Sequence, residues 1–295
     1  MTTAHRQKGV LWLPLDQPLD LESTLESGQA FRWRRSGPWW SGVLEGQAVE
    51  LRVRPGRLEY RSTMTPPQAM ADVLHRYLRL DDDLPAIQRA LSQDPEVARA
   101  IAAHPGLRLL RQEPWECLIS FICSSNSNIL RIRGVIERLA HSFGRPVSTG
   151  RRQRFTFPTP EVLAGAGEKR LARLRLGYRA AYVARTARIV ADGGLSLVAL
   201  REATYDEAKS ALMELPGVGE KVADCVLLFS LEKLEAFPVD VWVRRTLEER
   251  YLGGDRLPPK ALAAWARERF GSRGGYAQQY LFHRQRLEAR PGARS

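Results

Sequence analysis

The sequence has 295 residues, of which 44% are hydrophobic, and it carries a formal net charge of +12 with a pI near 10.1. This length accommodates one large or two modest domains, and the positive charge favours a polyanionic partner, nucleic acid before an anionic membrane. The three cysteines (Cys117, Cys123, Cys225) match neither a metal-binding pattern nor a disulfide framework, which argues against an iron–sulfur cluster. No apolar run is long enough to span a membrane, and residues 1–10 lack the apolar core of a signal peptide. We therefore expect an intracellular, soluble protein.

The first part of the chain, from about residue 10 to residue 64, is predicted to be rich in strands. Val49, Leu51 and Val53 alternate with charged residues, and a similar alternation follows a Pro-Gly turn at 55–56. Ahead of it, segment 27–33 combines a glycine with large aromatics and is interpreted as a strand entry with core aromatics. We predict an N-terminal antiparallel β-sheet domain over residues 1–64.

From residue 65 to residue 295 the periodicity is helical, so the predicted fold class is α+β with mostly helical lobes. Segment 114–122 is apolar and expected to be buried, 144–158 is a basic, turn-rich connection, and 290–295 is a disordered tail. Helices are predicted over 70–80, 86–91, 97–103, 129–143, 160–165, 168–174, 178–192, 196–202, 205–215, 220–230, 241–250, 259–270 and 274–288.

The most informative local motif is Leu-Pro-Gly-Val-Gly-Glu-Lys at 215–221. Pro216 ends one helix, Gly217 and Gly219 permit a tight hairpin, and a second helix begins near residue 220, which predicts a helix-hairpin-helix at about 205–230. The unpaired backbone N–H groups of the hairpin and first turn, at Gly217, Gly219 and Val222, favour one phosphate of a nucleic acid without sequence recognition. The alternative is a Pro-Gly turn that only joins two helices.

Two residues add chemistry to this motif. Lys221 lies in the first turn of the second helix, where the positive helix end and desolvation disfavour the ammonium and favour a nucleophilic amine. The alternative is a solvated lysine that contacts phosphate. Asp240 is a preferred N-cap for the helix 241–250, and a carboxylate that backbone N–H groups hold ionised also suits the stabilisation of a sugar cation in glycosidic bond cleavage.

The Lys221 and Asp240 pair after Leu-Pro-Gly-Val-Gly resembles the helix-hairpin-helix DNA glycosylase superfamily. From about residue 21 to residue 282 the chain resembles the eukaryotic-type 8-oxoguanine DNA glycosylase/AP lyase in five collinear blocks: SGQAFRW at 27–33, CLISFICSSN at 117–126, LGYRA at 176–180, VADC at 222–225 and YAQQYLF at 276–282. The resemblance implies excision of 8-oxoguanine opposite cytosine from double-stranded DNA, followed by strand nicking through β-elimination. Lys221 is then the nucleophile that forms a Schiff base, and Asp240 assists base loss. We expect the protein to need no cofactor and to act as a monomer.

Four residues match the base pocket of that family. Gly28 matches the position whose backbone carbonyl accepts the N7–H of the oxidised purine, and Gln278 matches the residue that recognises the Watson–Crick edge. Phe282 and Cys225 match the two walls that sandwich the extruded base. Without the resemblance, we would interpret Phe282 as a core aromatic and Cys225 as a small buried hydrophobe.

Four further residues match the family positions that fill the vacated stack and recognise the orphaned cytosine. They are Asn126, Arg131, Tyr178 and Arg179. Asn and Arg supply donors for cytosine, and Tyr suits a stacking wedge. Alone, the two arginines would be interpreted as solvated charges.

Two positions depart from the family pattern. Trp242 stands where relatives often carry a His that contacts DNA phosphate, so the contact and its pH dependence are expected to differ. Phe229 replaces a smaller residue beside the pocket and is expected to tighten it. The backbone carbonyls of Met213, Leu215 and Val218 match a site where some relatives bind a structural cation; no other metal is expected.

Three alternatives compete with this interpretation. The nearest is a related glycosylase for alkylated or other damaged purines. The second is a non-catalytic helix-hairpin-helix protein that binds DNA, with Lys221 as a phosphate contact and Asp240 as an N-cap only. A membrane-surface protein is least favoured, since no basic amphipathic helix stands out.

Overall fold

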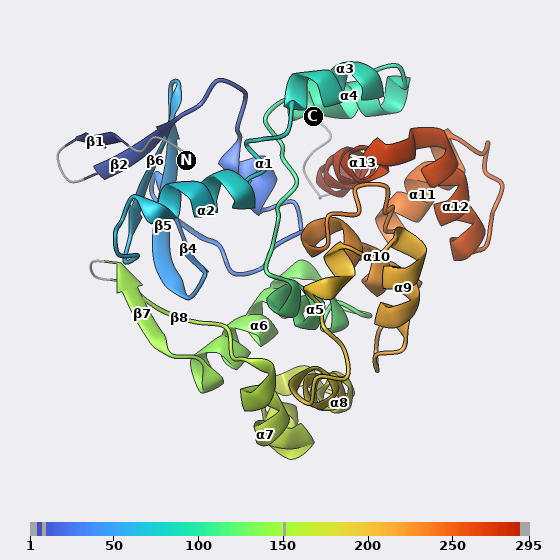
Figure 1. The fold of residues 1–295 in the computed structure, drawn as a ribbon. Helices are drawn as coiled ribbons and strands as arrows, with labels where there is room; N and C mark the ends of the chain where they lie inside the picture. Colours follow the sequence, from blue (N-terminus) through green and yellow to red (C-terminus); the bar gives the residue numbers. More distant parts are fainter. Residues whose placement is uncertain (1–4, 8–9, 150–151, 290–295) are drawn as a thin grey trace.

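The computed structural model describes residues 5–7, 10–149 and 152–289, and it combines an N-terminal sheet with a larger helical part (Figure 1). The predicted α+β class is confirmed. The disordered tail predicted over 290–295 lies outside the described residues.

The N-terminal sheet is antiparallel, and its strand order within the described residues is β1-β2-β6-β5-β4-β3. The strands are β1 (His5–Gln7), β2 (Val10–Pro14), β3 (Arg34–Ser36), β4 (Trp39–Leu44), β5 (Gln47–Arg54) and β6 (Arg57–Ser62). The predicted alternation buries Val49 and Leu51, and Leu51 pairs with Tyr60 across β6. Val53 is more exposed than expected because it lies next to the exposed turn at 55–56.

Two helices share the core of this sheet. Leu25 of α1 (Leu21–Leu25) and Met70 of α2 (Ala69–Tyr77) are fully buried among sheet residues, and Figure 1 shows α2 lying across the sheet. A second core joins the remaining helices. The domain boundary at residue 64 stays a prediction; α2, which follows that boundary in sequence, packs in the core of the sheet.

Segment 27–33 is a loop that leads directly into β3, and its aromatics Phe31 and Trp33 are buried, as predicted for a strand entry with core aromatics. Trp33 Nε1 donates to the Tyr77 hydroxyl at 2.8 Å in the sheet core, whereas Phe31 packs edge-on against Phe121 in the helical core. The segment is a buried loop because its side chains anchor it in both cores.

The helical part follows the predicted boundaries closely. Its elements are α3 (Leu84–Leu91), α4 (Pro95–Ala103), α5 (Pro114–Ile122), α6 (Ile129–Phe143), α7 (Pro160–Leu171), η1 (Ala172–Leu176), α8 (Arg179–Ala191), η2 (Ala199–Arg201), α9 (Tyr205–Met213), α10 (Glu220–Ser230), α11 (Val241–Arg250), α12 (Pro259–Phe270), η3 (Gly271–Arg273) and α13 (Gly274–Glu288). The break expected between 165 and 168 is a Gly167 with φ of +69° inside α7. Segment 196–202 contains only the short η2 instead of the predicted helix.

The connection 144–158 is more regular than predicted, because it contains the hairpin β7 (Pro146–Thr149) and β8 (Arg152–Phe155). Arg154 forms an ion pair with Glu137 of α6 at 3.0 Å. The hairpin is therefore held partly by charge, which explains why apolar alternation did not indicate it. No helix in the described ranges is both long and apolar enough to cross a lipid bilayer.

Candidate active site

The hairpin between α9 and α10 contains two glycines with different constraints. Gly217 has φ of +83°, and a Cβ there would lie 2.7 Å from Cδ2 of Tyr182, so backbone and packing both require glycine. Gly219 is the N-cap of α10, makes no side-chain cap and has open space beside it. The first N–H groups of α10, including that of Val222, therefore lack a side-chain acceptor in the described structure.

A buried ionic network behind the hairpin fixes α9 against α10. Asp224 accepts a hydrogen bond from the Tyr205 hydroxyl at 2.7 Å, and Lys209 Nζ lies 3.1 Å from Asp224 and 2.6 Å from Glu220. Burial raises the pKa of Asp224, and the Lys209 ammonium opposes that rise. We did not predict this network; it holds the hairpin and the first turn of α10 in one orientation.

Lys221 extends from α10 toward the C-terminal end of α5. Its Nζ donates to Oγ of Ser124 at 3.0 Å and lies 5.2 Å from the ring centroid of Phe121. Ser124 Oγ donates in turn to the Phe121 carbonyl at 2.7 Å. Ser124 belongs to the block at 117–126 but was not predicted as a site residue, since only this tertiary contact identifies it.

Asp240 is the N-cap of α11, as predicted. Its Oδ1 accepts the N–H groups of Trp242 at 3.0 Å and Val243 at 2.9 Å. Burial raises the pKa of Asp240, although these N–H groups and the Lys221 ammonium lower it. Within the described structure Lys221 and Asp240 form no ion pair, so the two groups are neighbours without a direct bond.

Gly28 and Phe282 come from opposite ends of the chain and meet in the structure. Gly28 has φ of +81°, and a Cβ there would lie 3.1 Å from Cε1 of Phe282 and 3.1 Å from Cδ1 of Ile129. Gln278, one turn earlier on α13, is 4% exposed, and its Oε1 has no hydrogen-bond partner. Such a buried acceptor calls for a partner that the protein does not supply.

Cys225 lies on α10, one turn after Lys221, and is buried. Burial raises the pKa of its thiol to about 12, although the neighbouring Lys221 ammonium lowers it. The thiol is therefore neutral at physiological pH and behaves as a small apolar group.

Three of the four residues predicted for the opposite base lie together. Asn126 Nδ2 donates to the Tyr178 hydroxyl at 3.4 Å, and Arg179 Nε donates to the Ser125 carbonyl at 3.0 Å while its guanidinium lies 4.5 Å from the Tyr178 ring centroid. Tyr178 is 51% exposed, which leaves its ring available for stacking. Arg131 is exposed in the first turn of α6, and within the described residues its side chain forms no hydrogen bond with these three.

The two departures from the family pattern occupy different surroundings. Phe229 is buried and stacks on Phe121, with ring centroids 5.6 Å apart, so it supports the ring beside Lys221. Trp242 is partly exposed in the first turn of α11, next to Asp240.

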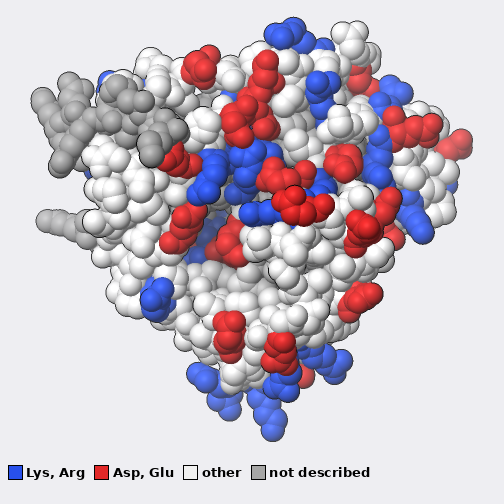
Figure 2. Space-filling model, in the orientation of Figure 1, with Lys and Arg blue, Asp and Glu red and all other residues white. Residues whose placement is uncertain are grey.

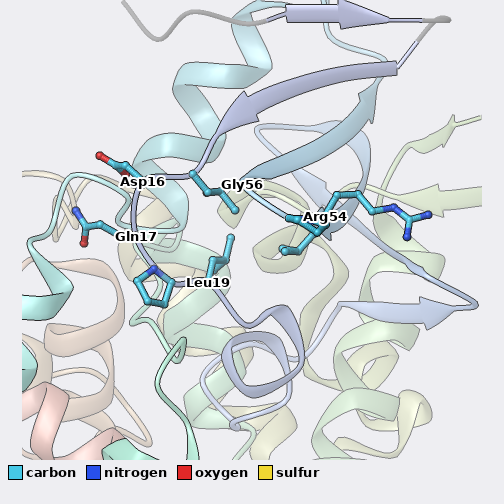
Figure 3. Close-up of a pocket in the computed structure, with 9 residues that line it drawn as sticks. Asp16, Gln17, Leu19, Arg54 and Gly56 are labelled. Carbon is cyan, nitrogen blue, oxygen red and sulfur yellow. The ribbon is translucent and has the colours of Figure 1, made fainter.

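One hollow of the described surface lies apart from the predicted site residues, whereas exposed basic side chains lie close in sequence to one of them. In Figure 2, acidic and basic side chains intermix over the middle of the visible face, whereas basic ones project at the lower tip, where Figure 1 places α7 and α8. This tip carries exposed Lys169, Arg170, Arg173 and Arg175, close in sequence to Tyr178. A cavity of about 430 Å³ between 15–19 and 53–56 contains none of the predicted site residues (Figure 3).

Comparisons with known proteins indicate the family to which the chain is similar. Residues 12–118 match the family model of the 8-oxoguanine DNA glycosylase N-terminal domain, and residues 119–270 match that of the HhH-GPD superfamily of base excision DNA repair proteins. The chain is 33% identical to a probable N-glycosylase/DNA lyase of Methanothermobacter thermautotrophicus, covering 90% of this chain and 93% of the relative. It is 34% identical to the N-glycosylase/DNA lyase OGG1 of Arabidopsis thaliana, covering 94% and 81%.

A solved structure is similar over nearly the whole chain. It is the Clostridium acetobutylicum 8-oxoguanine glycosylase/lyase in complex with double-stranded DNA containing cytosine opposite 8-oxoguanine. The TM-score is 0.91 at 30% identity, and the match covers 96% of this chain and 97% of that chain.

Proposed function

This chain belongs to the HhH-GPD superfamily of base excision DNA repair proteins, and on that premise we propose that it removes 8-oxoguanine paired with cytosine and nicks the resulting abasic strand. It is an N-glycosylase/DNA lyase of the 8-oxoguanine type, not a non-catalytic DNA-binding module. Two contacts support the assignment of its site: the hydrogen bond that holds Lys221 against Ser124, and the close approach of Gly28 to Phe282.

In the proposed reaction, the neutral Lys221 amine attacks C1′ of the flipped nucleotide. The C1′–N9 bond breaks, and its electron pair leaves with the base, which gains a proton. The nitrogen loses a proton, the C1′–O4′ bond breaks while O4′ gains a proton from water, and a C1′=N Schiff base forms. Removal of a C2′ proton then forms a C2′=C3′ double bond and breaks the C3′–O3′ bond, which expels the 3′ phosphate. Ser124 fixes the amine by its hydrogen bond at 3.0 Å.

Asp240 stabilises the positive charge that develops on the sugar during base loss. Its two N–H bonds fix the carboxylate at the start of α11 and favour the ionised form against the effect of burial. The absence of an ion pair with Lys221 suits this role, because the reacting sugar must lie between nucleophile and carboxylate.

Base selection is assigned to the pocket residues. The Gly28 carbonyl accepts the N7–H that oxidised guanine has and guanine lacks, and the free Oε1 of buried Gln278 offers an acceptor to the Watson–Crick edge. Phe282 and the neutral thiol of Cys225 pack on the two faces of the base. Support comes from the contact of Gly28 with Phe282.

The DNA around the lesion is held by two further groups of residues. Tyr178 fills the vacated stack, and Asn126, Arg131 and Arg179 donate to the orphaned cytosine. The N–H groups of Gly217, Gly219 and Val222, with Trp242, contact phosphate.

The hairpin is also proposed to bind a structural cation through backbone carbonyls. The Leu215 carbonyl accepts the Val218 N–H at 3.1 Å, which leaves a second lone pair for a cation shared with the Met213 and Val218 carbonyls. The enzyme acts as a monomer, since one chain supplies every residue assigned above. Its proposed place of action is inside the cell.

Borohydride trapping on duplexes with single lesions tests the function and the nucleophile together. Wild type and Lys233→Gln, whose lysine donates to the Arg201 carbonyl at 2.6 Å outside the site, should form a covalent adduct with 8-oxoguanine DNA. Lys221→Gln should form none. An undiminished adduct in Lys221→Gln would refute the nucleophile, and release of alkylated purines without 8-oxoguanine would favour the related glycosylase.

A further inference from the structure

The loop that carries Gly28 is held by three buried or half-buried glutamines. Gln279 of α13 donates from Nε2 to the Ser27 carbonyl at 3.1 Å, and Gln112 donates from Nε2 to the Gln29 carbonyl at 2.7 Å. The carbonyls on both sides of Gly28 are therefore fixed by side-chain amides that are distant in sequence.

Gln29 anchors the same loop with its own side chain. Its Nε2 donates to the carbonyls of Thr24 and Arg108, both at 2.9 Å, and its Oε1 accepts the Leu110 N–H at 2.8 Å. Both Gln29 and Gln279 are almost completely buried. Since a broken bond here leaves a buried polar group unsatisfied, these contacts resist local opening.

The Gly28 carbonyl differs from its neighbours, because it accepts no hydrogen bond from any residue that the structure describes. Glycine is the residue with the greatest backbone freedom, so a free glycine carbonyl would be expected to vary in direction. Its peptide unit is a rigid plane that joins the flanking units through the torsions at Gly28 and Gln29, and those flanking units are held by Gln279 and Gln112. Because both neighbouring units are held, the rotation that would redirect this unoccupied acceptor is restricted.

We propose that Gln29, Gln112 and Gln279 form a glutamine clamp that aims the Gly28 carbonyl at the N7–H of oxidised guanine. The clamp rests on the proposed function, in which that carbonyl selects the base. These glutamines are positioning residues: none of them is assigned a contact with the DNA. Gln279 follows Gln278 directly, so α13 supplies both a base contact and the bond that orients the opposite side of the pocket.

Methionine variants test the clamp, because methionine keeps the length of glutamine and removes its donor. For Gln112→Met and Gln279→Met we expect single-turnover excision of 8-oxoguanine opposite cytosine to fall about three- to tenfold each. Strand nicking at a preformed abasic site should keep its wild-type rate, because β-elimination requires no base recognition. Gln88→Met is the matched control: its Nε2 donates to the Pro105 carbonyl at 2.7 Å and to the Tyr280 hydroxyl at 2.8 Å, neither of which adjoins Gly28 in sequence, and both rates should persist.

The two rates distinguish the possible failures. If excision and nicking fall equally, the glutamines have only a general structural role and the clamp is overturned. Unchanged excision in the double Gln112→Met, Gln279→Met variant would overturn it as well. If wild type fails to excise 8-oxoguanine at all, the proposed function is wrong. A second readout is the affinity ratio of 8-oxoguanine and guanine duplexes in a Lys221→Gln background, which should move toward one on loss of the clamp.

Discussion

Asp240 caps α11 and is proposed to stabilise the sugar cation, and two substitutions separate these roles. Asp240→Ala removes both the carboxylate and the acceptor of the Trp242 and Val243 N–H groups. Asp240→Asn removes the charge but keeps an oxygen where Oδ1 lies. Both variants should lose base excision, by at least about a hundredfold if the carboxylate stabilises developing charge, whereas only Asp240→Ala should lose stability.

The stability difference follows from the cap. Replacing an N-cap acceptor with alanine costs about 0.5–2 kcal/mol, whereas Asn and Asp are nearly equivalent caps, so Asp240→Asn should remain within about 0.5 kcal/mol of wild type. Burial adds a pH dependence, because it raises the pKa of Asp240 above its ordinary value of 3.8. The stability contributed by the protonated carboxyl is full below 3.8 and is lost as pH rises through the folded-state pKa. Any advantage of Asp240→Asn should therefore appear at neutral pH and shrink on acidification.

Urea unfolding near neutral and at acidic pH measures the stability, and single-turnover excision measures the chemistry. Equal destabilisation of the Asn and Ala variants would contradict the capping argument. Wild-type excision by Asp240→Asn would contradict the catalytic role while leaving the cap intact.

Two further predictions concern the hairpin and the phosphate contact. Gly217→Ala should lower the free energy of unfolding by more than about 1 kcal/mol, since φ is +83° and its Cβ meets the Tyr182 ring, whereas Gly219→Ala should change it by less; equal urea midpoints would refute this. Trp242→His should introduce a pH dependence of DNA affinity, with tighter binding below the ordinary His pKa of about 6.5 and weaker binding above it. A pH profile parallel to that of wild type would place position 242 away from phosphate.

Local chemistry made much of the fold predictable. The hairpin followed from Pro216, Gly217 and Gly219, because these signals act within a few residues. Segment 27–33 was predicted as a strand entry with core aromatics and leads into β3, but its division between two separate cores depends on tertiary contacts that no local pattern indicates. The β7–β8 hairpin escaped prediction because an ion pair with α6, not apolar alternation, helps to hold it.

The site illustrates the same limit more sharply. Lys221 and Asp240 were evident as a local pair, but Ser124 lies 97 positions before Lys221, and Gln279 lies 252 positions after Ser27. Neither a serine after a buried helix nor a glutamine within a helix has a local pattern that reveals such a bond. Resemblance to a family supplied the pocket residues, and only the folded structure supplies the residues that position them.

These positions divide the site into two mechanical units. Lys221 and Asp240 begin α10 and α11, and the buried Asp224 network ties α10 to α9 on the side of the hairpin. Gly28 instead depends on the buried loop, on α13 and on the segment around Gln112. Since the lyase step requires only the first unit and base selection requires both, substitutions in the second unit should separate excision from strand nicking. Substitutions in the first unit should impair the two together.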